Sequence, residues 1–321
     1  MRVVFMGTPD FAVSSLEHLI ADGHEVVGVF TQPDKPRGRH QVMTAPPVKE
    51  CALIHEIPVY QPESLKNGEA MPILDELRPD IIVVAAYGQI LRSDVLEYPK
   101  YGCINVHASL LPKYRGAAPI NWVIVNGETE TGVTIMQMGE GLDTGDMLLS
   151  SSLLIEEDET AGELFDRLAV LGGNLLSEAL EKIEAGTIVP VPQDDSQSCY
   201  AKMLSKKDST IDWNRSAAEI HNQVRGLSPW PTAMTTLNDK QFKLHKTRKA
   251  FIAGLDLGDV STETEDDEPG TLYQQGSRLF VKCGDGQYLE LLEVQPLGSR
   301  RMSAEDYLRG HNVSEGKYVL R

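Results

Sequence analysis

Asn105 and His107 are the residues whose types and spacing most clearly suggest chemistry. They lie in the stretch CINVHASLLPKYRGAAPI (residues 103–120), where a short apolar run ends. Side chains two residues apart on a strand point to the same face of a sheet. Polar groups at the mouth of a buried strand need either backbone partners or a catalytic role, and the spacing alone leaves both alternatives open.

Asp143 is a third polar residue that could join this pair. It lies in the loop GEGLDT (residues 139–144), where it could also be a simple turn former. Asparagine offers a neutral N–H donor, and histidine offers a donor that can carry positive charge. A carboxylate beside the imidazole would hold the ring and favour its charged form. Such a set could stabilise an oxyanion and move a proton while an amine attacks a carbonyl carbon, with no protein nucleophile.

The elements of the first half could bring these residues together. Apolar runs such as EVVGVF (25–30) and DIIVVAAYG (80–88) alternate with helical segments. Nearly continuous apolar strands between helices are typical of a mostly parallel sheet covered on both faces. The sequence therefore predicts a doubly wound, Rossmann-like α/β domain, with residues 131–138 and 145–155 as an antiparallel edge. In such a sheet the site lies beyond the carboxyl ends of the strands.

The second half has a different character. Residues 187–208 carry prolines and many small polar residues with little periodicity, which is typical of a linker. Short strands expected around 232–252, 270–283 and 286–297 are separated by glycine-rich turns and predict a small β-barrel. The predicted division is a catalytic domain over 1–188, a linker over 189–207 and a barrel domain over 208–321.

Composition limits the classes of protein. The 321 residues are 41% hydrophobic, enough for a full core, and contain no apolar run of about 18 residues, so no membrane span is expected. The four cysteines are far apart and form no CxxC pair, so we expect no zinc or other metal site and free thiols in a reducing cytoplasm. The net charge of −17 argues against a chain that is basic all over.

Two local basic patches stand out against this acidic background. The loop 32–49 has four basic residues and one acid, and it follows the second predicted strand on the site's side of the sheet. The run KQFKLHKTRK (240–249) contains no acid, and in a strand its alternate residues would align cations along a phosphate backbone. A solvated loop and a charged edge strand are the alternatives that remain open.

Two separated motifs in the same order resemble those of a known family. NVHASLLPKYRGAAPI and GVTIMQMGEGLDTGDM are similar to the motifs of the folate-dependent formyltransferases. FMGTPDFA, VFTQPDKPRGR and VVAAYGQIL resemble the branch of that family that formylates methionyl-tRNA. IDW (211–213) and SPWPTA (228–233) extend the resemblance over essentially the whole chain.

The resemblance implies a reaction and a fold. The formyl group of 10-formyltetrahydrofolate would pass to the α-amino group of initiator methionyl-tRNA, and the second domain would be an open barrel resembling an OB-fold. Asn105, His107 and Asp143 would form the catalytic set. The folate-binding residues would be Ser109, Leu110, Leu111, Pro112, Gln89, Ile90 and Leu91. The tRNA-binding residues would be Lys35, Arg37, Arg39, Lys206, Lys207, Lys243, Lys246 and Arg248.

Other functions are compatible with parts of the sequence. A formyltransferase acting on a small amine would use the same catalytic residues but would not need the basic loop or the barrel. A dinucleotide dehydrogenase shares the fold class, but GTPDFA lacks the GxGxxG fingerprint. A non-catalytic tRNA-binding module would not need the Asn, His and Asp set. We therefore expect a cytoplasmic, monomeric enzyme that binds folate and tRNA.

Overall fold

The computed structural model describes the chain except for residues 39–40, 66–67, 251–266 and 314–317. Its residues group into two compact units. The first unit comprises Met1–Pro119, Glu130–Leu154 and Phe165–Ala201. The second comprises Ile120–Thr129, Ile155–Leu164 and Lys202–Arg321.

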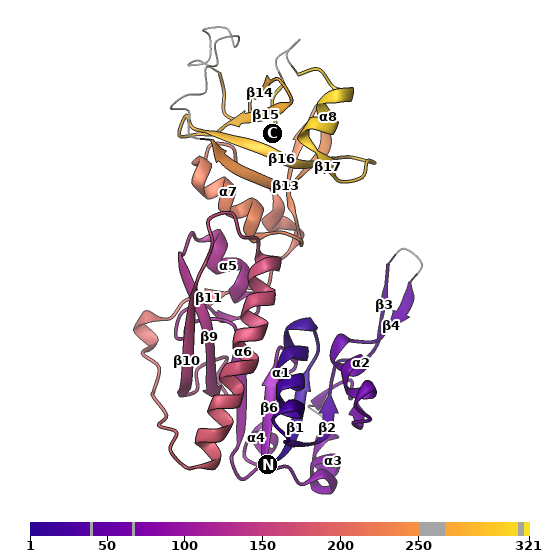
Figure 1. Ribbon diagram of the computed structural model, residues 1–321, viewed down its shortest axis with the longest axis vertical. Helices are drawn as coiled ribbons and strands as arrows, with labels where there is room; N and C mark the ends of the chain where they lie inside the picture. Colours follow the sequence, from indigo (N-terminus) through magenta and orange to yellow (C-terminus); the bar gives the residue numbers. More distant parts are fainter. Residues whose placement is uncertain (39–40, 66–67, 251–266, 314–317) are drawn as a thin grey trace. The chain divides into compact units, whose positions relative to one another are not determined.

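The first unit is built on a seven-stranded sheet with the order β10-β9-β7-β6-β1-β2-β5 (Figure 1). Five of its strands run parallel, and β9 and β10 add an antiparallel edge, as predicted. The five residues of β6 are all buried and four are Ile or Val, which favours a strand that is covered on both faces. The strands are β1 (Arg2–Gly7), β2 (Glu25–Phe30), β5 (Val59–Tyr60), β6 (Ile81–Ala85), β7 (Cys103–His107), β9 (Glu130–Gln137) and β10 (Met147–Leu154).

Helices cover both faces of this sheet. On one face, Leu74 and Val95 pack with Met6 and Val84 in one buried cluster. On the other, the rings of Phe11 and Phe165 meet edge to face at 5.7 Å. The helices are α1 (Asp10–Ala21), α2 (Pro47–Ile54), α3 (Ala70–Leu77) and α4 (Ser93–Leu96), with α5 (Pro119–Val125) and α6 (Ala161–Glu184) contributing residues to both units.

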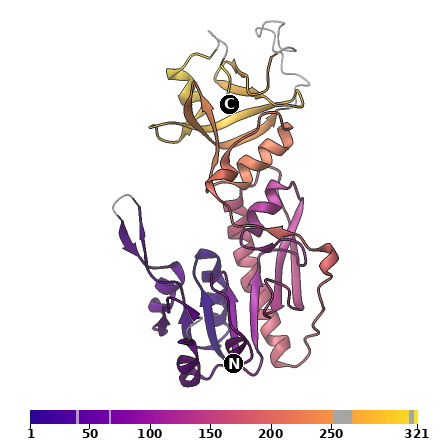
Figure 2. The same ribbon diagram turned by 180° about the vertical axis from the view of Figure 1, so that it is seen from behind.

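The basic loop after β2 forms a hairpin. Strands β3 (Lys35–Arg37) and β4 (Val42–Thr44) pair antiparallel, and the hairpin stands off from the sheet in Figures 1 and 2. Lys49, at the base of this loop, is held by the Asp34 carboxylate at 2.9 Å and by Gln61 at 2.8 Å. Its charge is therefore neutralised locally, whereas Lys35 is exposed.

The segment predicted as a linker is hydrogen-bonded to the first unit as far as residue 201. Val191 forms a bridge with Met147, the first residue of β10. Strand β11 (Tyr200–Ala201) pairs parallel with β8 (Arg115–Gly116), and a short 3-10 helix, η2 (Asp195–Gln197), precedes it. The stretch from 189 to 201 therefore belongs to the surroundings of the predicted site, which its composition did not indicate.

The second unit contains an antiparallel sheet with the order β12-β13-β16-β15-β14, and β17 pairs with β16. The last residues of the chain connect to two segments of this unit, because Leu320 forms a β-bridge with Leu237 and Val319 forms one with Thr271. Both parts of the predicted fold class, the parallel-rich sheet and the C-terminal antiparallel domain, are confirmed. The strands are β12 (Ala233–Leu237), β13 (Lys240–Ala250), β14 (Leu272–Gln275), β15 (Arg278–Lys282), β16 (Tyr288–Pro296) and β17 (Met302–Ser303).

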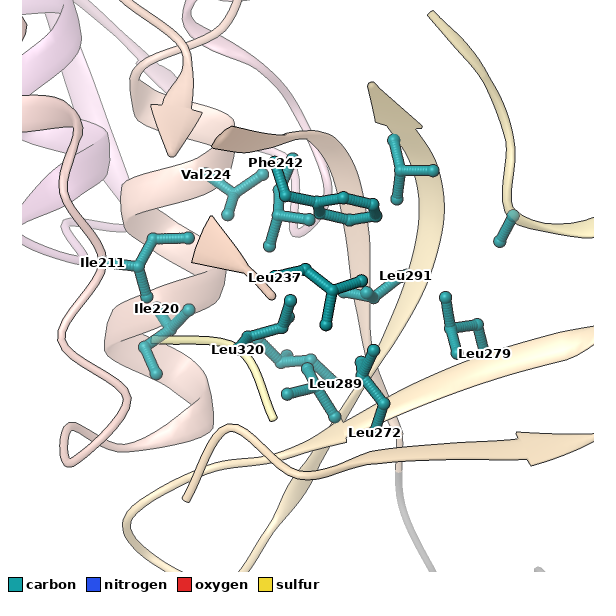
Figure 3. Close-up of a cluster of buried hydrophobic side chains, with 14 of the residues drawn as sticks. Ile211, Ile220, Val224, Leu237, Phe242, Leu272, Leu279, Leu289, Leu291 and Leu320 are labelled. Carbon is teal, nitrogen blue, oxygen red and sulfur yellow. The ribbon is translucent and has the colours of Figure 1, made fainter. Parts of the chain in front are cut away.

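A large apolar core packs the helix of this second unit against its strands. Figure 3 shows side chains such as Ile220 and Val224 of the helix α7 (Ala217–Gly226) facing Leu237 and Leu289 of the strands. A capping box between Ser216 and Glu219 satisfies the first backbone N–H groups of α7, which fixes where this helix begins. The remaining helical segments are η3 (Lys206–Ser209) and α8 (Ala304–Gly310).

Candidate active site at the carboxyl ends of the central strands

Asn105 and His107 lie on the same face of β7, as their spacing predicts. Val106, between them, points the other way, because a side-chain carbon placed at Gly172 of α6 would lie 3.0 Å from its Cγ1. Strand β7 runs between β6 and β9, and His107 stands opposite Thr134 of β9. Both polar side chains thus lie toward the end of a central strand, where open α/β sheets hold their ligands.

His107 and Asp143 form the closest polar pair of the site. The Nδ1 atom of His107 lies 3.7 Å from Oδ2 of Asp143, and the side chains are 6% and 14% exposed. The other ring nitrogen, Nε2, donates to the main-chain oxygen of Tyr114 at 2.9 Å. Both neighbours of the ring are acceptors, so an imidazolium with a proton on each nitrogen would satisfy both. At 3.7 Å, Nδ1 and the Asp143 carboxylate are neighbours but do not form a short hydrogen bond.

Asn105 differs from its neighbours because its carboxamide is unpaired. It is half-buried, and among the described residues no group forms a hydrogen bond with its side chain. A buried amide normally finds a protein or water partner. Of the two alternatives that the spacing left open, backbone groups do not satisfy this asparagine among the described residues, so its N–H donors are available to a ligand.

The Asp143 carboxylate is oriented by a backbone group. The N–H of Gly116 donates to Oδ2 at 2.8 Å. Asp143 itself adopts a left-handed conformation with φ of 51°, which costs a non-glycine residue of the order of 1 kcal/mol or more. Such a conformation persists only where the surroundings hold it.

The SLLP segment (residues 109–112) is hydrogen-bonded to β9. The hydroxyl of Ser109 is fully buried and donates to the Lys113 main-chain oxygen at 2.7 Å. Thr134 donates to the Ser109 carbonyl and accepts from the Leu111 N–H. A side-chain carbon at Gly132 would lie 2.7 Å from Leu110 Cδ2, so Leu110 lies over β9. Of the four predicted folate-binding residues in this segment, Leu110 and Pro112 are half-buried and the other two are buried.

The second predicted folate segment follows β6. The Gln89 side chain accepts from the Leu65 N–H at 2.9 Å and donates to the Pro62 carbonyl, so it ties two loops together. Ile90 is 73% exposed, and Leu91 is buried in the core. A ligand could therefore meet the Ile90 side chain, whereas Leu91 offers only its backbone.

The thiol closest in sequence to the site is not a nucleophile. Cys103 begins β7, and burial raises the pKa of its thiol to about 12. The thiolate, which is the reactive form, is therefore scarce at neutral pH. Cys103 therefore does not offer a nucleophile to the site.

Comparison with known proteins decides the family. The family model described as formyl transferase matches residues 1–180, and the one described as formyl transferase, C-terminal domain, matches residues 203–312. The chain belongs to the formyl transferase family. A methionyl-tRNA formyltransferase from Caldanaerobacter subterraneus is 50% identical over 317 residues, covering 98% of this chain and 99% of that protein. One from Acetivibrio thermocellus is 49% identical over 320 residues, covering 99% of each.

Solved structures of the formyl transferase family share the fold. An N-formyltransferase from Helicobacter canadensis, in complex with folinic acid and dTDP-3-aminofucose, superposes with a TM-score of 0.67 at 21% identity. The match covers 92% of this chain and 99% of that protein. At this identity the likeness establishes the fold alone.

The basic residues of this formyl transferase are distributed over both units. Lys35 and Arg37 lie in strand β3 of the hairpin, and Arg39 lies outside the described residues. Lys206 and Lys207 are exposed in η3. The structure gives the positions of these residues but contains no tRNA, so their contacts with tRNA stay predictions.

Strand β13 aligns its cations in a way that simple alternation does not predict. Phe242 and Leu244 point inward, but the next inward residue is Thr247, because the register with β16 shifts around Lys246. This bulge places Lys243, Lys246 and Arg248 on the outward side. Regular alternation would have placed Lys243 on one face of the strand and Lys246 and Arg248 on the other face.

Arg248 is anchored on this outward side. Its guanidinium donates to the buried Glu290 carboxylate at 2.7 Å, and Arg278 donates to the same carboxylate. The hydrogen bonds from Arg278 and Arg248 lower the pKa of Glu290 and keep it ionised. Arg248 thus has less free charge than Lys243 and Lys246.

Several site residues were not predicted from the sequence. Tyr114 and Gly116 belong to the quoted stretch KYRG, which marked the region but gave them no role. Thr134 lies opposite His107 on the neighbouring strand. This proximity follows from the antiparallel register of β7 and β9, which the sequence alone does not give. Gln193 lies in the predicted linker, and the sequence around it does not indicate a role in the site.

Gly116 is expected to tolerate no side chain. Its φ is 111°, and a Cβ there would lie 2.5 Å from a Tyr200 ring carbon and 2.7 Å from the Ala201 carbonyl oxygen. Gly116→Ala should therefore lower the free energy of unfolding by about 1–3 kcal/mol and misplace the N–H that binds Asp143. Urea denaturation measures the first effect, and the transfer rate measures the second.

Gly139→Ala is the matched control for that substitution. Gly139 lies in the Asp143 loop, but a Cβ there meets no atom within 4 Å. Equal unfolding midpoints for the two variants would contradict the packing found at Gly116.

Proposed function

We propose that this formyl transferase moves the formyl group of 10-formyltetrahydrofolate to the α-amino group of initiator methionyl-tRNA. The amine nitrogen attacks the formyl carbon, a C–N bond forms, and the carbonyl oxygen becomes negative. The bond from that carbon to N10 of the folate then breaks, and N10 takes up a proton while the attacking nitrogen loses one. The protein has to stabilise the oxyanion and manage that proton.

The observation that carries the proposal is the unpaired carboxamide of Asn105 beside the neighbouring side chains of His107 and Asp143. Two hydrogen-bond donors, one neutral and one able to carry charge, lie on the same strand face. Preorganised donors of this kind stabilise a developing oxyanion more effectively than water does.

His107 can direct Nδ1–H at the oxyanion. Its Nε2–H is already committed to the Tyr114 carbonyl, which fixes the plane of the ring. The 3.7 Å separation from Asp143 leaves Nδ1–H without a short hydrogen bond of its own. The charged form of this ring would stabilise the substrate oxygen most strongly when that oxygen becomes negative.

Asp143 is the group that can accept the proton of the attacking amine, directly or through one water. Its carboxylate is partly exposed, and the Gly116 N–H fixes its orientation. An α-amino group has an ordinary pKa of about 7.7–8.0, and the adjacent ester bond to the tRNA lowers it further. An appreciable share of the amine is therefore neutral at physiological pH and needs little activation. The proton has to leave only after attack, when the nitrogen becomes strongly acidic.

The loops around residues 86–91 and 109–112 are suited to hold the folate. Both follow strands that end beside Asn105, and they offer the exposed Ile90 side chain together with half-buried Leu110 and Pro112. An apolar contact surface with a few polar groups is typical of sites for flat cofactors. Among the described residues, no cluster of His, Cys, Asp and Glu is arranged to hold a metal ion.

The acceptor is assigned to tRNA from the relatives' names and from the basic residues, which would contact its phosphates. These residues are Lys35, Lys206, Lys207, Lys243 and Lys246.

The location of the enzyme is a separate part of the proposal. Within the described ranges, no helix is long and apolar enough to cross a membrane. All four cysteines are free. We place the enzyme in the cytoplasm, where charged tRNA is found, and expect it to act as a monomer.

The experiment is transfer of radiolabelled formyl from 10-formyltetrahydrofolate to initiator methionyl-tRNA. Label should appear on the charged tRNA and not on uncharged tRNA. A small-amine panel, including a nucleotide-linked amino sugar, distinguishes the alternative acceptor class. Transfer to a small amine at a higher kcat/KM than to methionyl-tRNA would contradict the proposal.

Binding of the tRNA is expected to depend on salt. Each lysine that contacts a phosphate contributes about 1 to the slope of log affinity against log salt. Replacing Lys243 and Lys246 by glutamine should therefore reduce the slope by about 2, as filter binding over a salt series would show.

Lys249→Gln is the control on the same strand. The Lys249 ammonium pairs with Glu157 at 2.8 Å, so this substitution should leave the slope near that of the wild type. A double variant with an unchanged slope would exclude β13 from the tRNA-binding surface.

A further inference from the structure

Gln193 holds the loop that carries Asp143. Its side-chain amide donates to the main-chain oxygen of Asp143 at 2.9 Å and to that of Gly145 at 2.7 Å. These two bonds use both N–H groups of one carboxamide. They reach two carbonyls on either side of Thr144, so they fix the turn that presents the carboxylate.

The other end of the same amide is fixed by Arg115. The Gln193 Oε1 atom accepts from Arg115 Nε at 3.0 Å and from Nη2 at 2.8 Å. Arg115 in turn donates to the Asp195 carboxylate at 2.7 Å. A charged donor pair fixes the orientation of the carboxamide, so that its N–H groups face the Asp143 loop and its oxygen does not.

Arg115 lies between two residues that already contact the catalytic pair. Tyr114 supplies the carbonyl that accepts from His107, and Gly116 supplies the N–H that donates to Asp143. Gln193 therefore connects the segment that orients both partners with the loop that carries one of them. A change at Gln193 would alter the separation of His107 and Asp143 without touching either side chain.

The loop needs such support. Asp143 has a φ of 51°, a conformation that a non-glycine residue adopts at a cost. Its neighbours Leu142 and Thr144 are exposed and give the loop little packing. Hydrogen bonds from Gln193 and Gly116 are what hold Asp143 against the imidazole, among the residues that the structure describes.

The geometry points to Gln193 as a positioning residue for formyl transfer, acting through Asp143. This inference rests on the proposed function and extends it to the segment 189–201, whose sequence resembles a plain linker. Misplacing a catalytic group by about 1 Å can cost on the order of 10²-fold in rate. Because Gly116 still binds the carboxylate, losing Gln193 alone should cost less.

The test is Gln193→Leu in the full-length enzyme. We expect kcat for formyl transfer to fall on the order of tenfold, with KM for both substrates within about twofold. Gln193→Glu should lose as much, because a carboxylate can still accept from Arg115 but cannot donate to the two carbonyls. Gln197→Leu is the control, since Gln197 is in the same segment and its side chain, within the described part of the chain, bonds only to Asp194. It should keep wild-type kcat.

A double-mutant cycle separates positioning from general loss of structure. In an Asp143→Asn background, Gln193→Leu should reduce kcat by less than about twofold, because its effect passes through the missing carboxylate. A fully additive loss would overturn the inference, as would a wild-type kcat in Gln193→Leu or a change confined to KM.

Amide hydrogen exchange gives a readout that needs no activity. Exchange over residues 139–145 should be faster in Gln193→Leu and unchanged in Gln197→Leu. If the wild type did not formylate methionyl-tRNA, the proposed function would fail, and this measurement would still decide whether Gln193 holds the loop. Unchanged exchange in Gln193→Leu would overturn the inference.

Discussion

Asn105→Ala is expected to lower kcat for formyl transfer by about 10²–10³, the usual cost of removing one oxyanion donor. The carboxamide of Asn105 has no partner among the described residues, so its removal breaks no hydrogen bond of the fold. KM for both substrates and the unfolding midpoint should therefore change little. Steady-state transfer assays and urea denaturation measure the two quantities on the same preparation.

Two further variants sharpen that prediction. Asn105→Asp keeps the shape but places a carboxylate where the oxyanion forms, so its loss should be at least as large. Asn174→Ala, at an exposed position on α6, should retain full activity. If Asn105→Ala instead kept kcat within about fivefold of the wild type, the oxyanion role of this residue would be wrong.

Asp143→Asn is expected to lower kcat by about 10²–10⁴, the range for loss of a general acid or base. Asparagine tolerates the left-handed conformation found here and can still accept from the Gly116 N–H through its amide oxygen. The variant should thus keep the loop and lose only the charge. Without that charge, the proton of the attacking amine has no acceptor.

A matched control distinguishes this role from a structural one. Asp166→Asn, exposed on α6, should keep the wild-type kcat and the wild-type unfolding midpoint. Asp143→Asn should keep the unfolding midpoint and lose only kcat. An Asp143→Asn enzyme with a normal kcat would contradict the assignment.

The sequence was sufficient for the parts of the site that depend on local patterns. Strand period placed Asn105 and His107 on one face, and the apolar runs predicted the parallel sheet that ends beside them. Asp143 was a candidate because of its glycine-flanked loop, and the second motif of the resemblance contains it. The structure brings Asp143 to His107 across 36 positions of the chain, at 3.7 Å.

The remaining features depend on contacts that no local pattern encodes. Gln193 looks like a polar linker residue, and its role becomes visible only when β11 pairs with β8 and places the segment beside the Asp143 loop. The bulge in β13 likewise arises from its pairing with β16. Alternation along KQFKLHKTRK predicts two opposite faces, whereas the register shift gathers Lys243 with Lys246.

The central claim is that an amide and a carboxylate-supported imidazolium stabilise the oxyanion formed when the amine adds to the formyl carbon. Its most direct test is the single-turnover rate of labelled formyl transfer by His107→Ala, with both substrates saturating. The account predicts a rate at least about 100-fold below wild type, with the affinity for 10-formyltetrahydrofolate within about threefold. A single-turnover rate close to that of the wild type would contradict it.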